Sequence, residues 1–121
     1  MKEQQTNGKV IVVDHIDKDN YKEYIGKTVK VTGDVDLSGL GLTKIPINFT
    51  EVGGDFICAL NELYSLKGSP SKVGGSFYCF RNKLSSLEGA PRKVGRDFNC
   101  WGNPLKSTKG KPEYIGGEFI S

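Results

Sequence analysis

His15 is the residue that could do acid–base chemistry, and it directly follows Asp14. A histidine oriented by a carboxylate acts as a general base when a nucleophile stands beside it. His15 is the only histidine of the chain, and no nucleophile motif accompanies the pair. A lone histidine next to an aspartate is more often structural or solvated. We therefore predict no catalytic residue and no enzyme activity.

Three cysteines are the next candidates, because thiolates bind metal ions. Cys58, Cys79 and Cys100 are 21 residues apart and none belongs to a Cys-x-x-Cys pair, so they form a poor tetrahedral zinc site. We expect them to pack in the core of a protein from a reducing compartment. Gly53-Gly54 lacks the continuation of a phosphate-binding loop. The sequence therefore predicts neither a metal ion nor a cofactor.

The elements that carry these residues belong to a repeat of 21 residues. The segment 52–58 returns at 73–79 and 94–100, and a further copy starts at 115. A fixed period of 20 to 50 residues indicates a solenoid, in which each unit buries its apolar face only against its neighbours. With a degenerate first copy, the predicted repeats are 31–51, 52–72, 73–93, 94–114 and a partial repeat 115–121.

A different pattern precedes the repeats. Residues 9–14 form a β-branched run typical of a strand, residues 17–26 predict a short helix, and residues 27–37 alternate like a second strand. A solenoid needs its first unit covered by a different element. We therefore expect residues 1–30 to form an α/β cap at the N-terminus.

Composition and charge narrow the function classes. No apolar run approaches the roughly 20 residues that span a bilayer, and the N-terminus lacks the apolar core of a secretory signal. We expect a cytoplasmic protein without a membrane partner. Residues 1–61 carry seven Lys/Arg and nine Asp/Glu, and residues 62–121 carry ten Lys/Arg and five Asp/Glu. The formal net charges of the two halves are therefore −2 and +5. A basic half favours an acidic partner or nucleic acid, although scattered loop lysines also serve solubility alone.

The unit Phe-x-Cys-x-x-Asn-x-Leu-x-Ser-Leu resembles the leucine-rich repeat, with Phe and Cys in two of the leucine positions. The period of 21 and the proline near the end of each unit resemble the short bacterial class. The motif Val-Gly-Gly-x-Phe-x-Cys also resembles the repeats of proteins from tailed bacteriophages. The resemblance implies an α/β solenoid, with a leucine-rich-repeat-like parallel β-sheet of about four to five strands behind the α/β cap.

In such a sheet, equivalent residues stack into columns about 4.8 Å apart. One buried column is predicted to contain Val35, Phe56, Phe77, Phe98 and Phe119. A second is predicted to contain Leu37, Cys58, Cys79 and Cys100. We expect the side-chain amides of Asn61, Asn82 and Asn103 to satisfy backbone groups of the turns as a ladder.

The side of each strand that faces away from the core carries the candidate binding residues. These are Ile57, Leu60, Tyr78, Phe80, Arg81, Asn99 and Trp101. Tyrosine, tryptophan and arginine are enriched at interface hot spots, and contiguous exposed aromatic residues are uncommon on monomers. In leucine-rich-repeat geometry this surface is the concave face. The alternative is that Phe80 and Trp101 fold over the sheet edge or pack on the cap and loops.

These features predict a non-catalytic module that binds a partner protein. The bacteriophage resemblance implies that the partner is a bacterial host protein, such as an enzyme or defence factor that is inhibited or redirected in the host cytoplasm. One alternative is nucleic-acid binding, with Tyr78 and Trp101 for base stacking. Its basic residues would be Arg81, Arg92, Lys93, Arg96, Lys106, Lys109 and Lys111. Another alternative is a homo-oligomer that forms through an unpaired C-terminal edge at Phe119 and Ile120.

Overall fold

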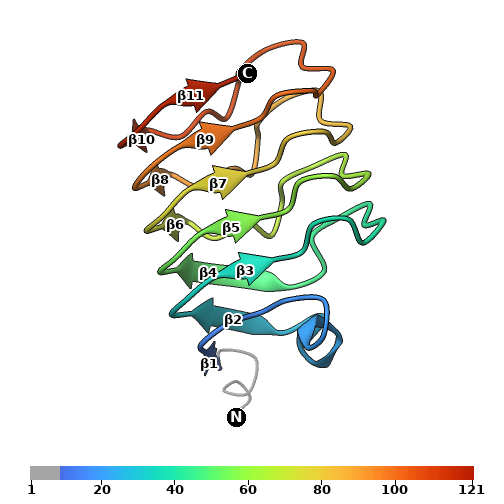
Figure 1. Ribbon diagram of the computed structural model, residues 1–121, viewed down its shortest axis with the longest axis vertical. Helices are drawn as coiled ribbons and strands as arrows, with labels where there is room; N and C mark the ends of the chain where they lie inside the picture. The colour runs from blue at the N-terminus through green and yellow to red at the C-terminus, as the bar shows by residue number, and fades with distance from the viewer. Residues whose placement is uncertain (1–8) are drawn as a thin grey trace.

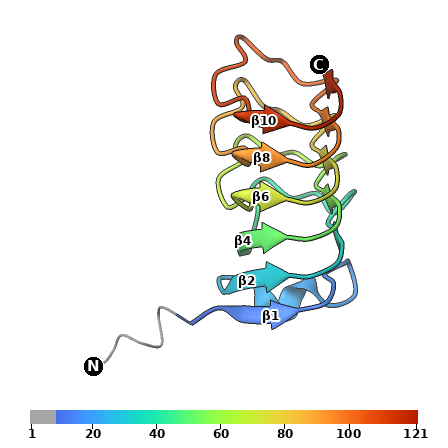
Figure 2. The ribbon, with the colours of Figure 1, turned by 90° about the vertical axis from the view of Figure 1, so that its left-hand side faces the viewer.

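The coils of the chain form two parallel β-sheets, and each coil after the first supplies one short strand to both sheets (Figure 1 and Figure 2). The computed structural model describes residues 9–121. Sheet A consists, in spatial order, of β1 (Ile11–Val13), β2 (Thr28–Val31), β4 (Asn48–Val52), β6 (Lys72–Val73), β8 (Lys93–Val94) and β10 (Tyr114–Ile115). Sheet B consists of β3 (Val35–Asp36), β5 (Phe56–Ile57), β7 (Phe77–Tyr78), β9 (Phe98–Asn99) and β11 (Phe119–Ile120). The protein is a β-solenoid of about five turns with repeats of about 21 residues.

The predicted α/β solenoid with a single sheet is wrong, because the fold is an all-β solenoid with two sheets. The additional sheet forms at the valine that precedes each pair of corner residues. Val52, Val73 and Val94 are buried, and each pairs in register with its equivalent in the next coil. Valine favours the extended backbone of a pleated, half-buried surface. The segment that ends at each of these valines is thus a strand of its own.

The strand predicted over 27–37 is likewise divided between the two sheets. β2 ends at Val31 and β3 begins at Val35, with Gly33 at the corner between them. The amide of Gly33 donates a hydrogen bond of 2.8 Å to the carbonyl oxygen of Asp14, and a Cβ at position 33 would press on that same oxygen. The corner therefore favours glycine, and the apolar alternation that continues through it conceals the break.

The predicted α/β cap is also wrong, because residues 9–26 form a further coil of the solenoid. β1 pairs with β2 in sheet A, and Ile16 forms a bridge to Val35 at the start of sheet B. The helix predicted over 17–26 is a short 3₁₀ helix, η1 (Tyr21–Tyr24), with no buried residue. The first coil therefore extends sheet A by one strand, joins sheet B only through the bridge at Ile16, and differs from the later coils in its 3₁₀ helix.

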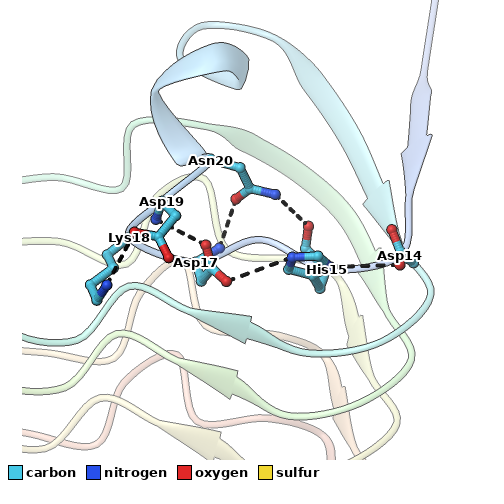
Figure 3. Close-up of polar contacts among 6 residues, drawn as sticks. All are labelled: Asp14, His15, Asp17, Lys18, Asp19 and Asn20. Carbon is cyan, nitrogen blue, oxygen red and sulfur yellow. Dashed lines mark hydrogen bonds and ion pairs between the residues drawn. The ribbon is translucent and has the colours of Figure 1, made fainter.

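Polar side chains explain why no α-helix forms before η1 (Figure 3). Oδ1 of Asn20 accepts a hydrogen bond from the backbone nitrogen of Asp17 at 2.8 Å, and Nδ2 of Asn20 donates to the carbonyl oxygen of His15 at 3.0 Å. Oδ1 of Asp17 accepts from the backbone nitrogen of Asp19 at 2.9 Å. Aspartate and asparagine side chains that bind nearby backbone stabilise turns in competition with helices.

The interior between the sheets consists of columns of equivalent residues, as predicted. The rings of Phe56 and Phe77 are stacked with centroids 5.2 Å apart, as are those of Phe77 and Phe98, and Phe119 continues the stack at 5.7 Å from Phe98. Val35 pairs with Phe56 at the other end of this column. The second predicted column, Leu37, Cys58, Cys79 and Cys100, is buried beside it.

The predicted asparagine ladder is confirmed. Nδ2 of Asn61 donates to the carbonyl oxygen of Leu37 at 2.8 Å, and its Oδ1 accepts from the backbone nitrogens of Leu40 and Leu42. Asn82 and Asn103 repeat the arrangement one and two coils further along. Each amide therefore joins two coils where the chain leaves sheet B.

A second polar ladder lies at the corner where the chain passes from sheet A to sheet B. Oδ1 of Asp34 accepts a hydrogen bond from the backbone nitrogen of Asp55 at 2.8 Å. Oδ1 of Asp55 accepts a hydrogen bond from the backbone nitrogen of Ser76 at 2.7 Å. Oγ of Ser76 in turn accepts one from the backbone nitrogen of Asp97 at 3.1 Å. The side chain that begins each strand of sheet B thus fixes the backbone of the next coil.

Candidate functional site

The neighbourhood of His15 lacks the geometry of a catalytic centre (Figure 3). Its Nδ1 lies 3.6 Å from Oδ2 of Asp14, its Nε2 lies 3.6 Å from Oδ2 of Asp17, and the side chain is 56% exposed. Exposed pairs at this distance contribute little to stability. Among residues 9–121, no group of three or more His, Cys, Asp or Glu side chains is arranged to hold a metal ion.

The cysteines line the core and are poor nucleophiles. Burial raises the pKa of the thiols of Cys58 and Cys79 well above the ordinary value. Burial also raises the pKa of Cys100, and the Sγ of this residue lies 3.4 Å from the carbonyl oxygen of Ile120. A thiol reacts and binds metals as the thiolate, which these environments disfavour. The cysteine column therefore contributes packing to the interior.

The outer face of sheet B carries the first three candidate binding residues side by side. Ile57, Tyr78 and Asn99 are equivalent residues of β5, β7 and β9, and they pair in register across the sheet. All three are half-buried and alternate with the buried phenylalanines. This surface corresponds to the face that the sequence analysis assigned as concave. Here it is the outside of one sheet of a two-sheet stack.

The residues that directly follow the cysteines form a column in which side-chain exposure increases from coil to coil. Ala59 is fully buried, Phe80 is half-buried and Trp101 is 51% exposed. The ring of Phe80 meets the ring of Tyr78 edge-on, with centroids 6.3 Å apart. Oδ1 of Asn99 accepts a hydrogen bond from the backbone nitrogen of Trp101 at 3.0 Å. The Asn99 side chain thus supports the turn that presents Trp101.

The next column contains two residues with an unusual backbone. Leu60 and Arg81 have φ angles of 60° and 55°, in the left-handed region. Gly39 and Gly102 occupy the equivalent positions of the flanking coils, with φ angles of 67° and 75°. Side chains at these positions are strained, because the left-handed conformation brings Cβ close to the following carbonyl oxygen. Leu60 and Arg81 are nevertheless exposed, so burial in the core does not compensate for the strain.

Arg81 and Trp101 lie together on this surface. The Cζ atom of Arg81 is 5.9 Å from the centre of the Trp101 ring, within the range of a cation–π contact. The structure therefore brings Tyr78, Phe80, Arg81 and Trp101 onto one side of the solenoid, over β7 and β9 and the turns that follow them. We call the seven predicted residues Ile57, Leu60, Tyr78, Phe80, Arg81, Asn99 and Trp101 the sheet B surface.

The remaining basic residues of the nucleic-acid alternative are spread around the coils. Arg92 lies 3.5 Å from Glu113 and Lys109 lies 3.5 Å from Glu88. Lys93 is on β8 of sheet A, whereas Arg81 follows β7 of sheet B. These positions do not form one continuous basic stripe with the aromatic residues of the sheet B surface.

The C-terminal edge proposed for self-association is partly covered by a lysine. Phe119 and Ile120 form β11, which lies at the end of sheet B and pairs with β9. Both residues are half-buried. Nζ of Lys111 lies 4.1 Å from the centre of the Phe119 ring. A charged side chain over the last ring of a stack disfavours apolar docking at that edge.

Comparisons with known proteins give no assignment. A scan against family models, a search of curated proteins and a search of solved structures each found no match to this chain. In the part of the chain that the structure describes, no helix has the length and apolar character needed to cross a membrane.

Sequence reasoning missed the left-handed backbone of Leu60 and Arg81. The signal was present in the repeat, because the same column contains Gly39 and Gly102. A column that contains glycine in some coils and large residues in others indicates a backbone that glycine suits best. The residues that depart from glycine are then the informative ones.

Proposed function

We propose that this protein is a non-catalytic interaction module that binds a partner protein on the sheet B surface. Its anchors are Tyr78, Phe80, Arg81 and Trp101, with Ile57, Leu60 and Asn99 around them. The module supplies a rigid support, since each of its coils is hydrogen-bonded in register to the next.

The observation that carries this proposal is the strained backbone of Leu60 and Arg81. A side chain in the left-handed conformation costs about 1–2 kcal/mol relative to glycine. Flanking coils avoid this cost with Gly39 and Gly102, which shows that the fold accepts glycine in this column. Strain retained at exposed positions is characteristic of functional sites.

The chemistry of the surface favours a protein partner. Tryptophan, tyrosine and arginine dominate the energetics of protein interfaces, and here they share one face with aliphatic Ile57 and Leu60. Leu60 and Trp101 are both 51% exposed, so large apolar areas are available to a partner. Exposed apolar side chains gathered on one face are a mark of an interaction site.

The finer identity of the module rests on resemblance. The sequence of the repeat resembles short bacterial leucine-rich repeats and the repeats of proteins from tailed bacteriophages. In that setting the partner is a host protein in the bacterial cytoplasm, and binding inhibits or redirects a host enzyme or defence factor. Fold and function are separable, so this step depends on analogy alone.

A pull-down with matched variants tests the proposal. The full chain is immobilised on beads and incubated with bacterial lysate, and the captured proteins are identified by mass spectrometry. The most enriched protein is then purified, and its binding to the chain is measured by titration calorimetry. We expect saturable binding that weakens at least tenfold in the double variant Phe80→Ala with Trp101→Ala. Ala59 occupies the same column, so this variant should fold.

The control variant removes two other exposed aromatic residues. Tyr64 and Tyr114 are 65% and 57% exposed and lie outside the sheet B surface. Tyr64→Ala with Tyr114→Ala should bind like the original chain. Equal binding by the folded Phe80/Trp101 variant would remove the sheet B surface from the proposal. Binding of single-stranded DNA that falls steeply with salt would favour the nucleic-acid alternative instead.

A further inference from the structure

One corner column of the solenoid consists of glycines whose absent side chains are replaced by a carboxylate. At Gly54, Gly75 and Gly117 an added Cβ would overlap Oδ1 of an aspartate in the preceding coil, namely Asp34, Asp55 and Asp97 respectively. Each of these oxygens accepts a hydrogen bond in the corner ladder. A side chain in this column therefore conflicts with the ladder wherever the preceding coil supplies aspartate.

Arg96 is the exception in this column, and the preceding coil explains how it fits. That coil has Ser76 where the others have aspartate, and Oγ of Ser76 keeps the ladder bond to the backbone nitrogen of Asp97. The hydroxyl oxygen of serine is one bond closer to the backbone than Oδ1 of aspartate, so it accepts the ladder bond, here at 3.1 Å, from a position nearer its own coil. The exchange of aspartate for serine thus makes room for an arginine.

Arg81 is the second arginine that stands in a glycine column. It shares its column with Gly39 and Gly102 and retains a left-handed backbone. Both arginines are exposed, and neither forms an ion pair with another of residues 9–121. Arg92 differs, because it lies on the other side of the coil and approaches Glu113.

The two arginines lie at opposite ends of the strands of sheet B. Arg96 precedes β9, and the column of Arg81 follows β7 and β9. Extended backbone of about 3.3 Å per residue separates the two columns by roughly 15–20 Å. Tyr78, Phe80 and Trp101 lie between them, so the aromatic centre of the sheet B surface is bordered by a positive charge at each end.

We infer that the partner of the sheet B surface is an acidic protein, which presents carboxylates to Arg81 and Arg96 on either side of an apolar contact. This inference rests on the proposed function. Guanidinium groups recognise carboxylates with bidentate hydrogen bonds, and unpaired charges at an interface rim select partners of opposite sign. The surface extends beyond the seven predicted residues to include Arg96.

Charge in the surroundings favours a protein over nucleic acid. Asp97 directly follows Arg96, and Glu118 is exposed at the start of the neighbouring strand β11. A continuous phosphate backbone would meet these carboxylates, whereas a protein can place single acidic residues at the two arginines. Aliphatic Ile57 and Leu60 also suit a protein contact better than a base-stacking groove.

The test uses a displayed library of random dodecapeptides panned on the full chain. We expect selected peptides to be richer in Asp and Glu than the unselected library. A selected peptide is then synthesised with a fluorophore, and its dissociation constant is measured by anisotropy. Arg81→Gly and Arg96→Gly should each weaken binding roughly three- to tenfold, because each removes one charged contact.

The variants are matched to the fold. Glycine is the resident of both columns in neighbouring coils, so both variants should remain folded. Arg92→Ser, which introduces the residue found at Ser71 in the same column, is the control and should bind as the original chain does. Selected peptides no more acidic than the library would overturn the inference, as would full affinity in the double variant Arg81→Gly with Arg96→Gly.

Two further arms separate the inference from its premise. Binding that depends on Trp101 but not on the arginines would contradict the acidic partner and leave the proposed function standing. Binding that depends on neither Trp101 nor the two arginines would contradict both the acidic partner and the proposed function. A labelled 20-nucleotide single-stranded DNA is titrated in parallel, and tight binding that is lost in the arginine variants would reassign the surface to nucleic acid.

Discussion

The side-chain amide of Asn82 donates a hydrogen bond of 3.0 Å to the carbonyl oxygen of Cys58, a residue 24 positions earlier in the chain. The same nitrogen lies 3.1 Å from the carbonyl oxygen of Cys79, and Oδ1 accepts from the backbone nitrogen of Leu63 at 2.9 Å. Asn82 is buried, so water cannot replace these bonds when the side chain is removed. One side chain thus satisfies the backbone of two coils.

Asn82→Ala should lower the free energy of unfolding by about 2–5 kcal/mol, since several buried backbone groups lose their partners. The measurement is urea denaturation followed by circular dichroism. Asn48→Ala is the control, because Asn48 is exposed and makes one side-chain bond of 3.3 Å to Thr28. It should change stability by no more than about 0.5 kcal/mol. Similar losses in the two variants would contradict the ladder.

Leu60→Gly should leave the free energy of unfolding within about 1 kcal/mol of the original value. Relief of the left-handed strain is offset by the greater entropy of glycine in the unfolded chain. Gly89→Ala should destabilise by more than that, because φ is +92° and the new Cβ would lie 2.7 Å from the backbone nitrogen of Lys67. Thermal unfolding of the two variants checks the comparison. A severe loss in Leu60→Gly would show that the fold requires this side chain.

The corner ladder predicts a measurable coupling between Asp55 and Gly75. Gly75→Ala alone should be destabilising, because the new Cβ overlaps Oδ1 of Asp55. Asp55→Ser reproduces the pair found at Ser76 and Arg96, so it should recover part of the loss. We expect a coupling energy of about 1 kcal/mol or more in a double-mutant cycle. Additive effects would mean that the serine and arginine at 76 and 96 are unrelated.

Alkaline pH should destabilise the fold through its buried thiols. Burial raises the pKa of Cys58 and Cys79 in the folded state, so only the unfolded chain releases these protons near pH 8.5. Stability from these groups is complete below that pH and falls by about 1.4 kcal/mol per thiol for each pH unit above it. Cys58→Ala should flatten this decline between pH 8.5 and 10. An unchanged slope would contradict the shift.

Lys111→Ala should increase self-association, because it uncovers the ring of Phe119 at the end of sheet B. Light scattering over a concentration series measures the mass of the particle. Lys106→Ala, at an exposed loop position, removes the same charge and should leave the mass unchanged. If neither variant associates, the C-terminal edge is not an apolar docking surface.

Periodicity predicted the columns of the core correctly, because the stacking depends only on the length of the repeat and on which of its positions face inward. A repeat of 21 residues with inward phenylalanine and cysteine positions allows one stacking, and Phe56, Phe77 and Phe98 are stacked accordingly. The asparagine ladder followed from the same register, since a buried amide needs backbone partners.

The second sheet and the first coil were not predictable in this way. Two-residue strands such as Lys72–Val73 are too short for a periodic signal, and alternation continues through the corner at Gly33. The segment containing Asp17 and Asn20 has helix-starting residues, but their side chains bind the local backbone. Only the three-dimensional register showed which of these local preferences prevails.

Parity predicted which candidate residues share the outer face of sheet B, but not whether a side chain fits at position 96. Outward parity placed Tyr78, Phe80 and Trp101 away from the core, whereas the fit of Arg96 at the corner depends on Ser76 in a neighbouring coil. A residue 20 positions away decides whether a side chain fits. That dependence is visible in the sequence only when the contact between the two columns is known.

The corner ladder also restricts how this gene can change length by recombination between its repeats. Removal of residues 76–96 joins Gly75 to Asp97 and keeps a glycine against Asp55. Removal of residues 75–95 deletes the same number of residues, but it places Arg96 against the carboxylate of Asp55. Two crossovers one codon apart therefore yield products of different stability, so the repeats are not freely exchangeable modules in inheritance.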